Sequence, residues 1–318
     1  MLRGLLWCLG LSLGGWLGSA LLAGALSPLV LALVLGLVVG NLRPPAGAEA
    51  GLAFAGKRLL RLGVMLLGCQ LTWSQLAELG WGPALLDLSV VVLILLAGYW
   101  LGTRWLGLDR ELVLLTSAGS AICGAAAVLA TESTLRARQD NATMAVATVV
   151  LFGSLGMLSY PLLYPWLGLD EYHFGIFTGA TVHEVAQVVA IGEAVGEQAL
   201  QQAVLVKLMR VGLLIPFLLL LTALAPRGEG RQGRIALPWF AFGFAAVVAI
   251  NSLGWVPGQY KPALALTSQA CLTMAMAALG LESHWRRLKA LGLKPLLLAA
   301  VLFGLLLGWG LLAIRLFG

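Results

Sequence analysis

Two long apolar segments contain the residues of this sequence whose types and spacing could do chemistry. The first, at 178–190, reads TGATVHEVAQVVA and includes His183, Glu184 and Gln187. Ionisable side chains at membrane depth are costly, so they are candidates for a function by default. The second, at 116–130, reads TSAGSAICGAAAVLA, and its glycines would loosen a helix halfway along.

The two segments also resemble each other. At an offset of 60 residues (179 − 119 = 60), a glycine, a valine and an alanine coincide. The pairs are Gly119 with Gly179, Val128 with Val188, and Ala130 with Ala190. We therefore expect both segments to be interrupted helices around one site.

A break in each helix would build an anion site from backbone groups. A helix interrupted near Gly179 would resume near Thr181, where free amides and the positive end of the helix dipole attract negative charge. The stretch from Gly119 to Gly124 would do the same in the other segment. The expected substrate-binding residues are Gly119, Ser120, Cys123, Gly124, Thr178, Thr181, His183 and Gln187.

Charged residues would supply the coupling and the attracting field. In an unbroken helix His183 and Gln187 share one face, with Glu184 about 100° away. Histidine titrates near neutrality, so His183 and Glu184 are the expected proton-coupling residues. Lys207 and Arg210 would attract the anion, or would extend to the membrane interface. Glu184 could instead be a structural partner of either cation, and His183 could simply bond to a neighbouring helix.

The composition predicts the class of protein. The chain has 318 residues, of which 60% are hydrophobic and 11% charged, and its mean hydropathy is +0.95. No soluble fold needs so much apolar surface, so we expect an all-α polytopic membrane protein. The net charge of +6 comes mainly from short loops between apolar spans, which favours positive-inside topology over nucleic-acid binding.

About ten to eleven membrane helices are expected. The apolar runs lie at 4–23, 27–42, 52–71, 83–103, 111–131, 141–164, 172–195, 203–225, 236–254, 262–281 and 293–316. Most basic loops fall on one side if the N-terminus is cytoplasmic. If 111–131 crossed the membrane completely, Arg136 and Arg138 would lie outside, against the positive-inside rule. Either they are tolerated there, or 111–131 is a re-entrant hairpin that returns to the cytoplasm and 172–195 is a second hairpin that enters from the outside. The sequence leaves these paths open.

An internal repeat predicts inverted halves. Residues 67–83 and 279–295 share seven identities at a constant offset of 212 (279 − 67 = 212), and the repeat units extend over about 51–104 and 263–316. The first connecting loop has only Glu78, whereas the second has four cations. The positive-inside rule then places the loops on opposite sides, an inverted repeat typical of secondary transporters.

Several kinds of chemistry are not expected. The four cysteines are scattered, and the three histidines have no metal-ligand spacing. No phosphate-binding glycine loop is present, so ATP-driven pumping is not predicted. Asp87 and Glu193 lie near the ends of their spans and are expected at the interface or in solvent. We expect no enzyme activity, no cofactor, no metal and no nucleic-acid partner, with H+ or Na+ as the coupling ion.

The motifs together resemble a known family. GSAICGAAA at 119–127, TVHEVAQVVA at 181–190 and LRLGVMLLG at 60–68 look like the YeiH family of bacterial inner-membrane proteins, which are labelled sulfate exporters. Ala126 departs from the pattern, since a serine would be expected there, and this removes a hydroxyl from the site. The resemblance implies a fold similar to the sodium/proton antiporter and bile-acid symporter superfamily. It has a panel domain, a core domain and two interrupted helices.

These observations lead to one expectation and two alternatives. The chain, 1–318, is expected to be a single transporter domain in the inner membrane, a possible homodimer, moving sulfate or a related sulfur oxyanion. The first alternative is a cation/proton antiporter or a Na+-coupled organic-anion symporter. The second is a membrane sensor or assembly factor whose buried polar residues are structural.

Overall fold

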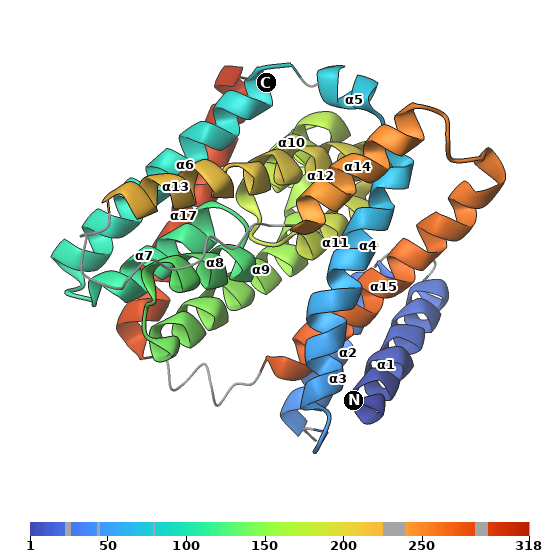
Figure 1. The fold of residues 1–318 in the computed structure, drawn as a ribbon, viewed down its shortest axis with the longest axis horizontal. Helices are drawn as coiled ribbons and strands as arrows, with labels where there is room; N and C mark the ends of the chain where they lie inside the picture. The colour runs from blue at the N-terminus through green and yellow to red at the C-terminus, as the bar shows by residue number, and fades with distance from the viewer. Residues whose placement is uncertain (23–26, 43–44, 79, 225–238, 284–291, 318) are drawn as a thin grey trace. The chain divides into compact units, whose positions relative to one another are not determined.

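The computed structural model describes residues 1–22, 27–42, 45–78, 80–224, 239–283 and 292–317. The described part of the chain contains helices and no strands (Figure 1), which confirms the all-α class. Within these described ranges, six helical segments are long and apolar enough to cross a membrane. They are Leu2–Leu21, Gly82–Trp105, Gln139–Leu167, Glu197–Ala223, Gly258–Glu282 and Leu293–Leu316.

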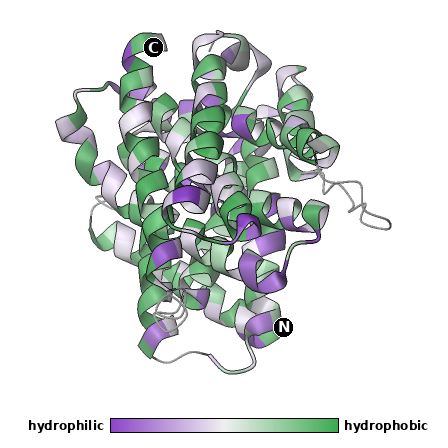
Figure 2. Cartoon of the chain, turned by 90° about the vertical axis from the view of Figure 1, so that its left-hand side faces the viewer, coloured by the Kyte–Doolittle hydropathy of each residue, from purple (hydrophilic) through white to green (hydrophobic). Residues whose placement is uncertain are grey.

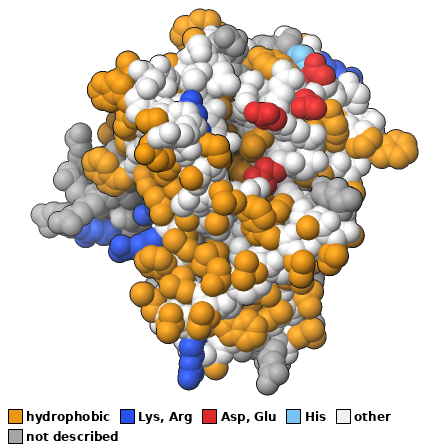
Figure 3. All heavy atoms as spheres, turned by 90° about the vertical axis from the view of Figure 1, so that its right-hand side faces the viewer, with side chains coloured by type: hydrophobic (Ala, Val, Ile, Leu, Met, Phe, Trp, Pro, Cys, Tyr) orange, Lys and Arg blue, Asp and Glu red, His pale blue; other side chains and the backbone are white. Residues whose placement is uncertain are grey.

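Hydrophobic residues dominate these helices along their length (Figure 2), and hydrophobic side chains cover much of the face drawn in Figure 3. This distribution suits helices that meet lipid on one side and other helices on the other. The basic residues at 227–234 and 286–289, on which part of the predicted topology rests, lie outside the described residues. The cytoplasmic position of the N-terminus therefore stays a prediction.

The chain forms two compact units. The first comprises Met1–Leu79, Val189–Gly196 and Trp239–Arg286, and the second comprises Gly80–Val188, Glu197–Pro238 and Arg287–Gly318. The first unit contains α1 (Leu2–Leu21), α2 (Pro28–Leu42), α3 (Glu49–Phe54), η1 (Ala55–Leu59), α4 (Leu60–Leu67), η2 (Gly68–Gln70), α5 (Trp73–Glu78), α14 (Trp239–Ser252), η4 (Gly258–Tyr260) and α15 (Lys261–Glu282).

Glycines bring the backbones of the first unit close together. A Cβ atom added to Gly36 of α2 would lie 2.6 Å from the Ala277 carbonyl oxygen of α15, and one added to Gly40 would lie 2.6 Å from that of Leu281. Small residues at such positions let membrane helices approach closely, which is where their association energy arises. The Ser268 hydroxyl of α15 also donates to the Gly63 carbonyl of α4 at 2.6 Å.

The second unit contains the two segments singled out in the sequence. Its elements are α6 (Gly82–Trp100), η3 (Leu101–Trp105), α7 (Arg110–Ala121), α8 (Ala125–Leu135), α9 (Gln139–Leu167), α10 (Glu171–Thr181), α12 (Glu197–Gly212), α13 (Leu214–Leu224) and α17 (Leu293–Phe317). Helix α11 (Val185–Val195) begins in this unit and ends in the first. Both predicted interruptions are present, between α7 and α8 and between α10 and α11.

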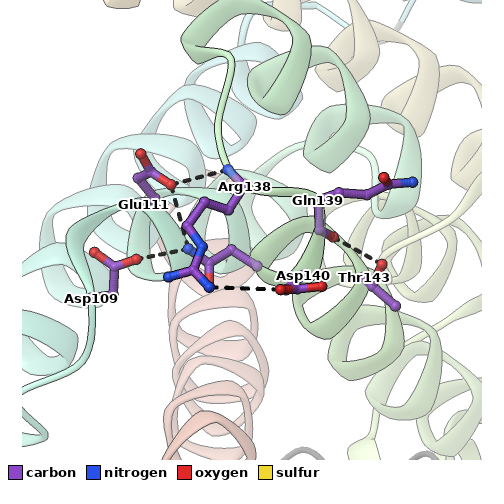
Figure 4. A network of polar contacts seen from close by, with 7 residues as sticks. Asp109, Glu111, Arg138, Gln139, Asp140 and Thr143 are labelled. Carbon is purple, nitrogen blue, oxygen red and sulfur yellow. Dashed lines mark hydrogen bonds and ion pairs between the residues drawn. The ribbon is translucent and has the colours of Figure 1, made fainter.

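The segment formed by α7 and α8 is a helical hairpin. The side-chain amide of Asn141, in the first turn of α9, donates at 2.7 Å to the carboxylate of Asp109, the residue immediately before α7. The Arg138 backbone N–H likewise donates to Glu111 at 3.1 Å, and Arg138 pairs with Asp140 at 3.6 Å (Figure 4). A helix that continued through the membrane would separate these ends by about 30 Å. The segment therefore returns to the level from which it started.

This return path resolves the disagreement in the charge pattern. Arg136 and Arg138 lie after α8, beside the start of α7 and Arg110, so all three belong to the same side. The core between the hairpin arms is apolar, with Leu115 of α7, Val128 of α8 and Val149 of α9 in one buried cluster. The sequence had left this re-entrant path as one of two alternatives.

The segment formed by α10 and α11 also returns. Helices α10 and α12 run parallel, since Gly175 lies against Ala199 and Gly179 lies against Ala203. Helix α12 starts only two residues after α11 ends, so the chain is back beside the start of α10 when α12 begins. Asp170 is the N-cap of α10. Its carboxylate accepts from the His173 backbone N–H at 2.9 Å and lies 2.6 Å from His173 Nδ1. These two contacts lower the pKa of Asp170.

The predicted repeat has matching helix positions. Helix α3 begins at Glu49 and α15 at Lys261, the same offset of 212 (261 − 49). Helix α6 begins at Gly82 and α17 at Leu293, an offset of 211. Residues 284–291 of the second copy lie outside the described residues, and the opposite orientation of the copies in the membrane stays a prediction.

Candidate functional site at the hairpin tips

The tips of the two hairpins are equivalent three-residue breaks. The first is residues 122–124 and the second residues 182–184, so the offset of 60 read from the sequence (182 − 122 = 60) holds to the residue. The first break lies within the expected stretch from Gly119 to Gly124, whereas the second lies three residues beyond Gly179, the glycine expected to cause it. Gly119 is inside the last turn of α7 and Gly179 is inside α10. The second half-helix therefore starts at Val185 and not near Thr181.

The displaced glycines serve packing. A Cβ at Gly119 would lie 2.6 Å from the Val128 side chain across the hairpin. Gly175 and Gly179, four residues apart, let α10 approach the backbone of α12, the small-residue pattern of close helix pairs. Of Gly119, Gly124 and Gly179, Gly124 is the one that lies in a break, with φ 67° and ψ −136°; in the second break Val182 is extended, with φ −79° and ψ 149°.

The two tips touch each other through Gly124 and Glu184. The Glu184 carboxylate accepts from the Ala125 backbone N–H, at the start of α8, at 3.4 Å. A Cβ at Gly124 would lie 2.6 Å from Glu184 Cγ and 3.3 Å from the His183 carbonyl oxygen. The positive N-terminal end of α8 therefore faces a carboxylate of the protein itself.

Gln187 closes the start of α11. Its side-chain oxygen accepts from the Glu184 backbone N–H at 3.1 Å, half of the reciprocal arrangement known as a capping box. Gln187 also lies against Gly153 of α9. The expected common face of His183 and Gln187 is wrong, because His183 lies in the break and not in a helix.

The Lys207 ammonium joins the two breaks from α12. It donates to the carbonyl of Ile122 at 2.8 Å and to the carbonyl of Val182 at 2.8 Å. These residues are the C-caps of α7 and α10, where unpaired carbonyls and the negative end of the helix dipole gather. Lys207 is fully buried.

Arg210 reinforces the same ends. Its guanidinium donates to the carbonyls of Ala180 and Val182, and it too is fully buried. The alternative that Lys207 and Arg210 extend to the membrane interface is therefore wrong. Their hydrogen bonds hold the second tip, and Lys207 ties it to the first.

Asp87 of α6 is a buried site residue, although its position near the end of an apolar run predicted the membrane interface. It is 1% exposed and not interfacial. Neither carboxylate oxygen has a hydrogen-bond partner among the described residues, and the charged groups that act on Asp87 are Arg210 and Lys207. A single aspartate inside an apolar run was the available signal. Asp87 and Glu184 both act electrostatically on Lys207, and Asp87 also acts on Arg210.

His183 and Thr178 have buried polar atoms that remain available. His183 Nδ1 and Thr178 Oγ1 have no hydrogen-bond partner within the described ranges. The His183 ring lies 6.0 Å from the Phe303 ring of α17, centroid to centroid. Thr181, by contrast, is occupied, since it donates to the Phe177 carbonyl at 2.6 Å and accepts from the Tyr160 hydroxyl at 3.0 Å.

The remaining candidates lie around the first break. Cys123 is buried in the break and is acted on electrostatically by Lys207, Arg210 and Glu184. Ser120 is buried in the last turn of α7. The tips thus bring together Gly124, His183, Glu184, Gln187, Lys207 and Arg210, whereas Gly119, Thr178, Thr181 and Ser120 belong to the adjoining helix ends.

Glu193 lies outside this site, in the first unit. Its Oε1 accepts from Gln269 of α15 at 3.2 Å, while its Oε2 is buried. The expectation that Glu193 is solvated is wrong. Its partner is 76 residues away in the chain, which is why the sequence did not indicate the pairing.

Comparison with known proteins assigns the family. Residues 3–299 match the model of the family described as conserved hypothetical protein 698. The chain belongs to this family. It is 42% identical over 310 residues to the UPF0324 inner membrane protein YeiH of Escherichia coli (strain K12), covering 95% of this chain and 89% of that protein. It is 44% identical over 297 residues to a UPF0324 membrane protein of Pseudomonas putida, covering 90% and 84%.

The relatives confirm the predicted resemblance to YeiH proteins and, with the six apolar helices, indicate a multi-pass inner-membrane protein. The UPF0324 inner membrane protein YeiH of Salmonella typhi is 41% identical over 313 residues, covering 95% of this chain and 89% of that protein. No solved structure matches the chain. The family names state a location and no activity, so function has to be argued from the site.

Proposed function

We propose that this protein is a secondary transporter that moves a small anion across the inner membrane through the hairpin tips. Sulfate or a related sulfur oxyanion is the leading substrate. The observation that carries the proposal is the meeting of two re-entrant breaks beside two buried cations, at Gly124 and Glu184. Non-helical backbone at membrane depth is tolerated only where protein buries it or a water-filled cavity lies beside it, and in transporters such breaks form the substrate site.

The charges of the site favour a proton-coupled anion. Lys207 and Arg210 supply two positive charges, and Asp87 and Glu184 can supply two negative ones. With both carboxylates ionised the site is neutral. A proton on each carboxylate would leave two positive charges, which matches a dianion such as sulfate. In this scheme the anion and two protons bind together, and no net charge is buried.

His183 is the residue we expect to contact the anion. Its buried Nδ1 is unpartnered in the described part of the chain, and an imidazole nitrogen that carries a proton donates well to an oxyanion. Thr178 offers a second unpartnered hydroxyl. Lys207 contributes its field, since two of its three N–H groups already bind carbonyls.

The test is uptake by the purified protein in liposomes. The substrates are sulfate, sulfite, thiosulfate, taurine and two carboxylates, each with and without an inward proton gradient. We expect the gradient to accelerate uptake of a sulfur oxyanion. His183→Ala should abolish uptake with little effect on folding, and Glu184→Gln should remove the response to the gradient.

Matched variants are available as controls. His173→Ala changes a histidine that contacts Asp170 outside the site, and Glu197→Gln changes an exposed glutamate; both should transport normally. Uptake of carboxylates only in the presence of Na+ would favour the symporter alternative. No uptake of any substrate, together with a partner that copurifies, would favour the sensor or assembly factor.

A further inference from the structure

The carbonyl groups at the ends of α7 and α10 form a site for a positive charge. Ile122 and Val182 occupy equivalent positions in the two breaks, 60 residues apart, and each is the C-cap of its half-helix. Both carbonyl oxygens lie 2.8 Å from the same atom, Lys207 Nζ. Carbonyls at the C-terminal ends of broken membrane helices are the groups that coordinate Na+ in secondary transporters.

Lys207 fills this position with a charge that belongs to the chain. Its ammonium is completely buried and is held at the two carbonyls by the side chain of α12. Arg210 shares the Val182 carbonyl and adds the Ala180 carbonyl. Two cations that belong to the chain thus offset the negative C-terminal ends of two half-helices. Without them, a dissolved cation would have to bind there and be released in each transport cycle.

We propose that the Lys207 ammonium is a tethered cation that takes the place of a coupling Na+ at the hairpin tips. One expectation rests on the proposed transport function: anion transport should need no Na+. The expectation about stability does not depend on transport. The tips should be stable without any alkali cation, and removal of the ammonium should create a site for one.

The spatial arrangement also limits what Lys207 does for substrate. Two of the three ammonium hydrogens are used by Ile122 and Val182, so at most one can reach an anion. Its first role is therefore to hold the two tips together. Asp87 and Glu184, which act on Lys207 electrostatically, can then exchange protons beside a cation that stays in place.

The experiment measures the melting temperature of the purified full-length protein. The salts are NaCl, LiCl, methylammonium chloride and N-methylglucamine chloride at equal ionic strength. The wild-type protein should melt at the same temperature in all four. Lys207→Ala should melt lower and should gain several degrees in methylammonium or Na+, because a ligand that binds the folded state raises its melting temperature with occupancy. Lys261→Ala, at an exposed lysine, should behave as the wild type does.

Two further measurements keep the inference testable if Lys207→Ala does not fold. Lys207→Arg keeps the charge and should stay insensitive to Na+, whereas Lys207→Gln loses it and should respond. A Na+-dependent rise in the wild-type melting temperature would overturn the proposal, as would a Lys207→Gln protein that ignores every cation. None of these readouts requires transport, so failure of the anion-transport proposal would be seen separately, in the liposome assay.

Discussion

Replacing Gly124 with alanine tests the contact between the hairpin tips. Gly124 has φ 67° and ψ −136°, a region that is essentially restricted to glycine and whose occupation by another residue costs about 1–3 kcal/mol. The new Cβ would also lie 2.6 Å from Glu184 Cγ, which is closer than real Cβ atoms come to carbon. Overpacking of this kind costs about 1–3 kcal/mol.

The two contributions together predict a loss of about 2–6 kcal/mol in the free energy of unfolding. Gly168→Ala is the matched control. Gly168 also has a positive φ, 65° with ψ 24°, but nothing lies within 4 Å of a Cβ added there. Its replacement should cost only about 1–2 kcal/mol, the ordinary penalty of a left-handed residue.

A double-mutant cycle isolates the steric part. Glu184→Ala removes the Cγ atom that a Cβ at Gly124 would meet, so Gly124→Ala should cost less in the Glu184→Ala background than in the wild type. The difference should be about 1–3 kcal/mol. The assay is denaturant unfolding in mixed micelles, followed by tryptophan fluorescence. The contact between the tips would be refuted by equal losses of stability for Gly124→Ala and Gly168→Ala. A coupling free energy of zero between Gly124→Ala and Glu184→Ala would refute it as well.

Three further predictions concern the charges and the packing of the second unit. Asp87→Asn removes one of two carboxylates beside Lys207 and Arg210, so it should reduce proton-driven uptake in liposomes about tenfold or more, whereas Asp140→Asn, on the surface, should not. Gly179→Leu should separate α10 from α12 and lower the melting temperature, because even a Cβ at Gly179 would lie 2.5 Å from the Ala203 carbonyl oxygen; a normal melting temperature would contradict this packing. Contacts with His173 lower the pKa of Asp170, so Asp170 stabilises the fold above its unfolded pKa and this contribution is lost as pH falls through its lower folded pKa. The difference in melting temperature between wild type and Asp170→Ala should accordingly be present at pH 7 and shrink below about pH 4, and a difference that persists in acid would contradict it.

The sequence by itself determined the class of the protein and the equivalence of its two special segments. Apolar runs of membrane length require helices, because a helix satisfies every backbone group internally. The offset of 60 aligned segments whose breaks prove equivalent to the residue, at 122–124 and 182–184. Of the glycines expected to interrupt the helices, Gly124 does lie in a break, whereas Gly119 and Gly179 are packing residues. A glycine in the sequence does not reveal whether its freedom is used for a turn or for a close approach.

Tertiary structure alone decided the path of the hairpins and the partners of the buried charges. Whether 111–131 crosses or returns depends on Asn141 meeting Asp109, a contact over 32 residues that no local pattern encodes. The same holds for Lys207, whose partner carbonyls are 85 and 25 residues away, and for Asp87, whose burial depends on the position of α12. In a helix that is apolar on all sides, hydrophobic periodicity does not mark the face that is buried against protein. The contacts that position these charges therefore follow from helix packing and not from the order of residues along any one helix.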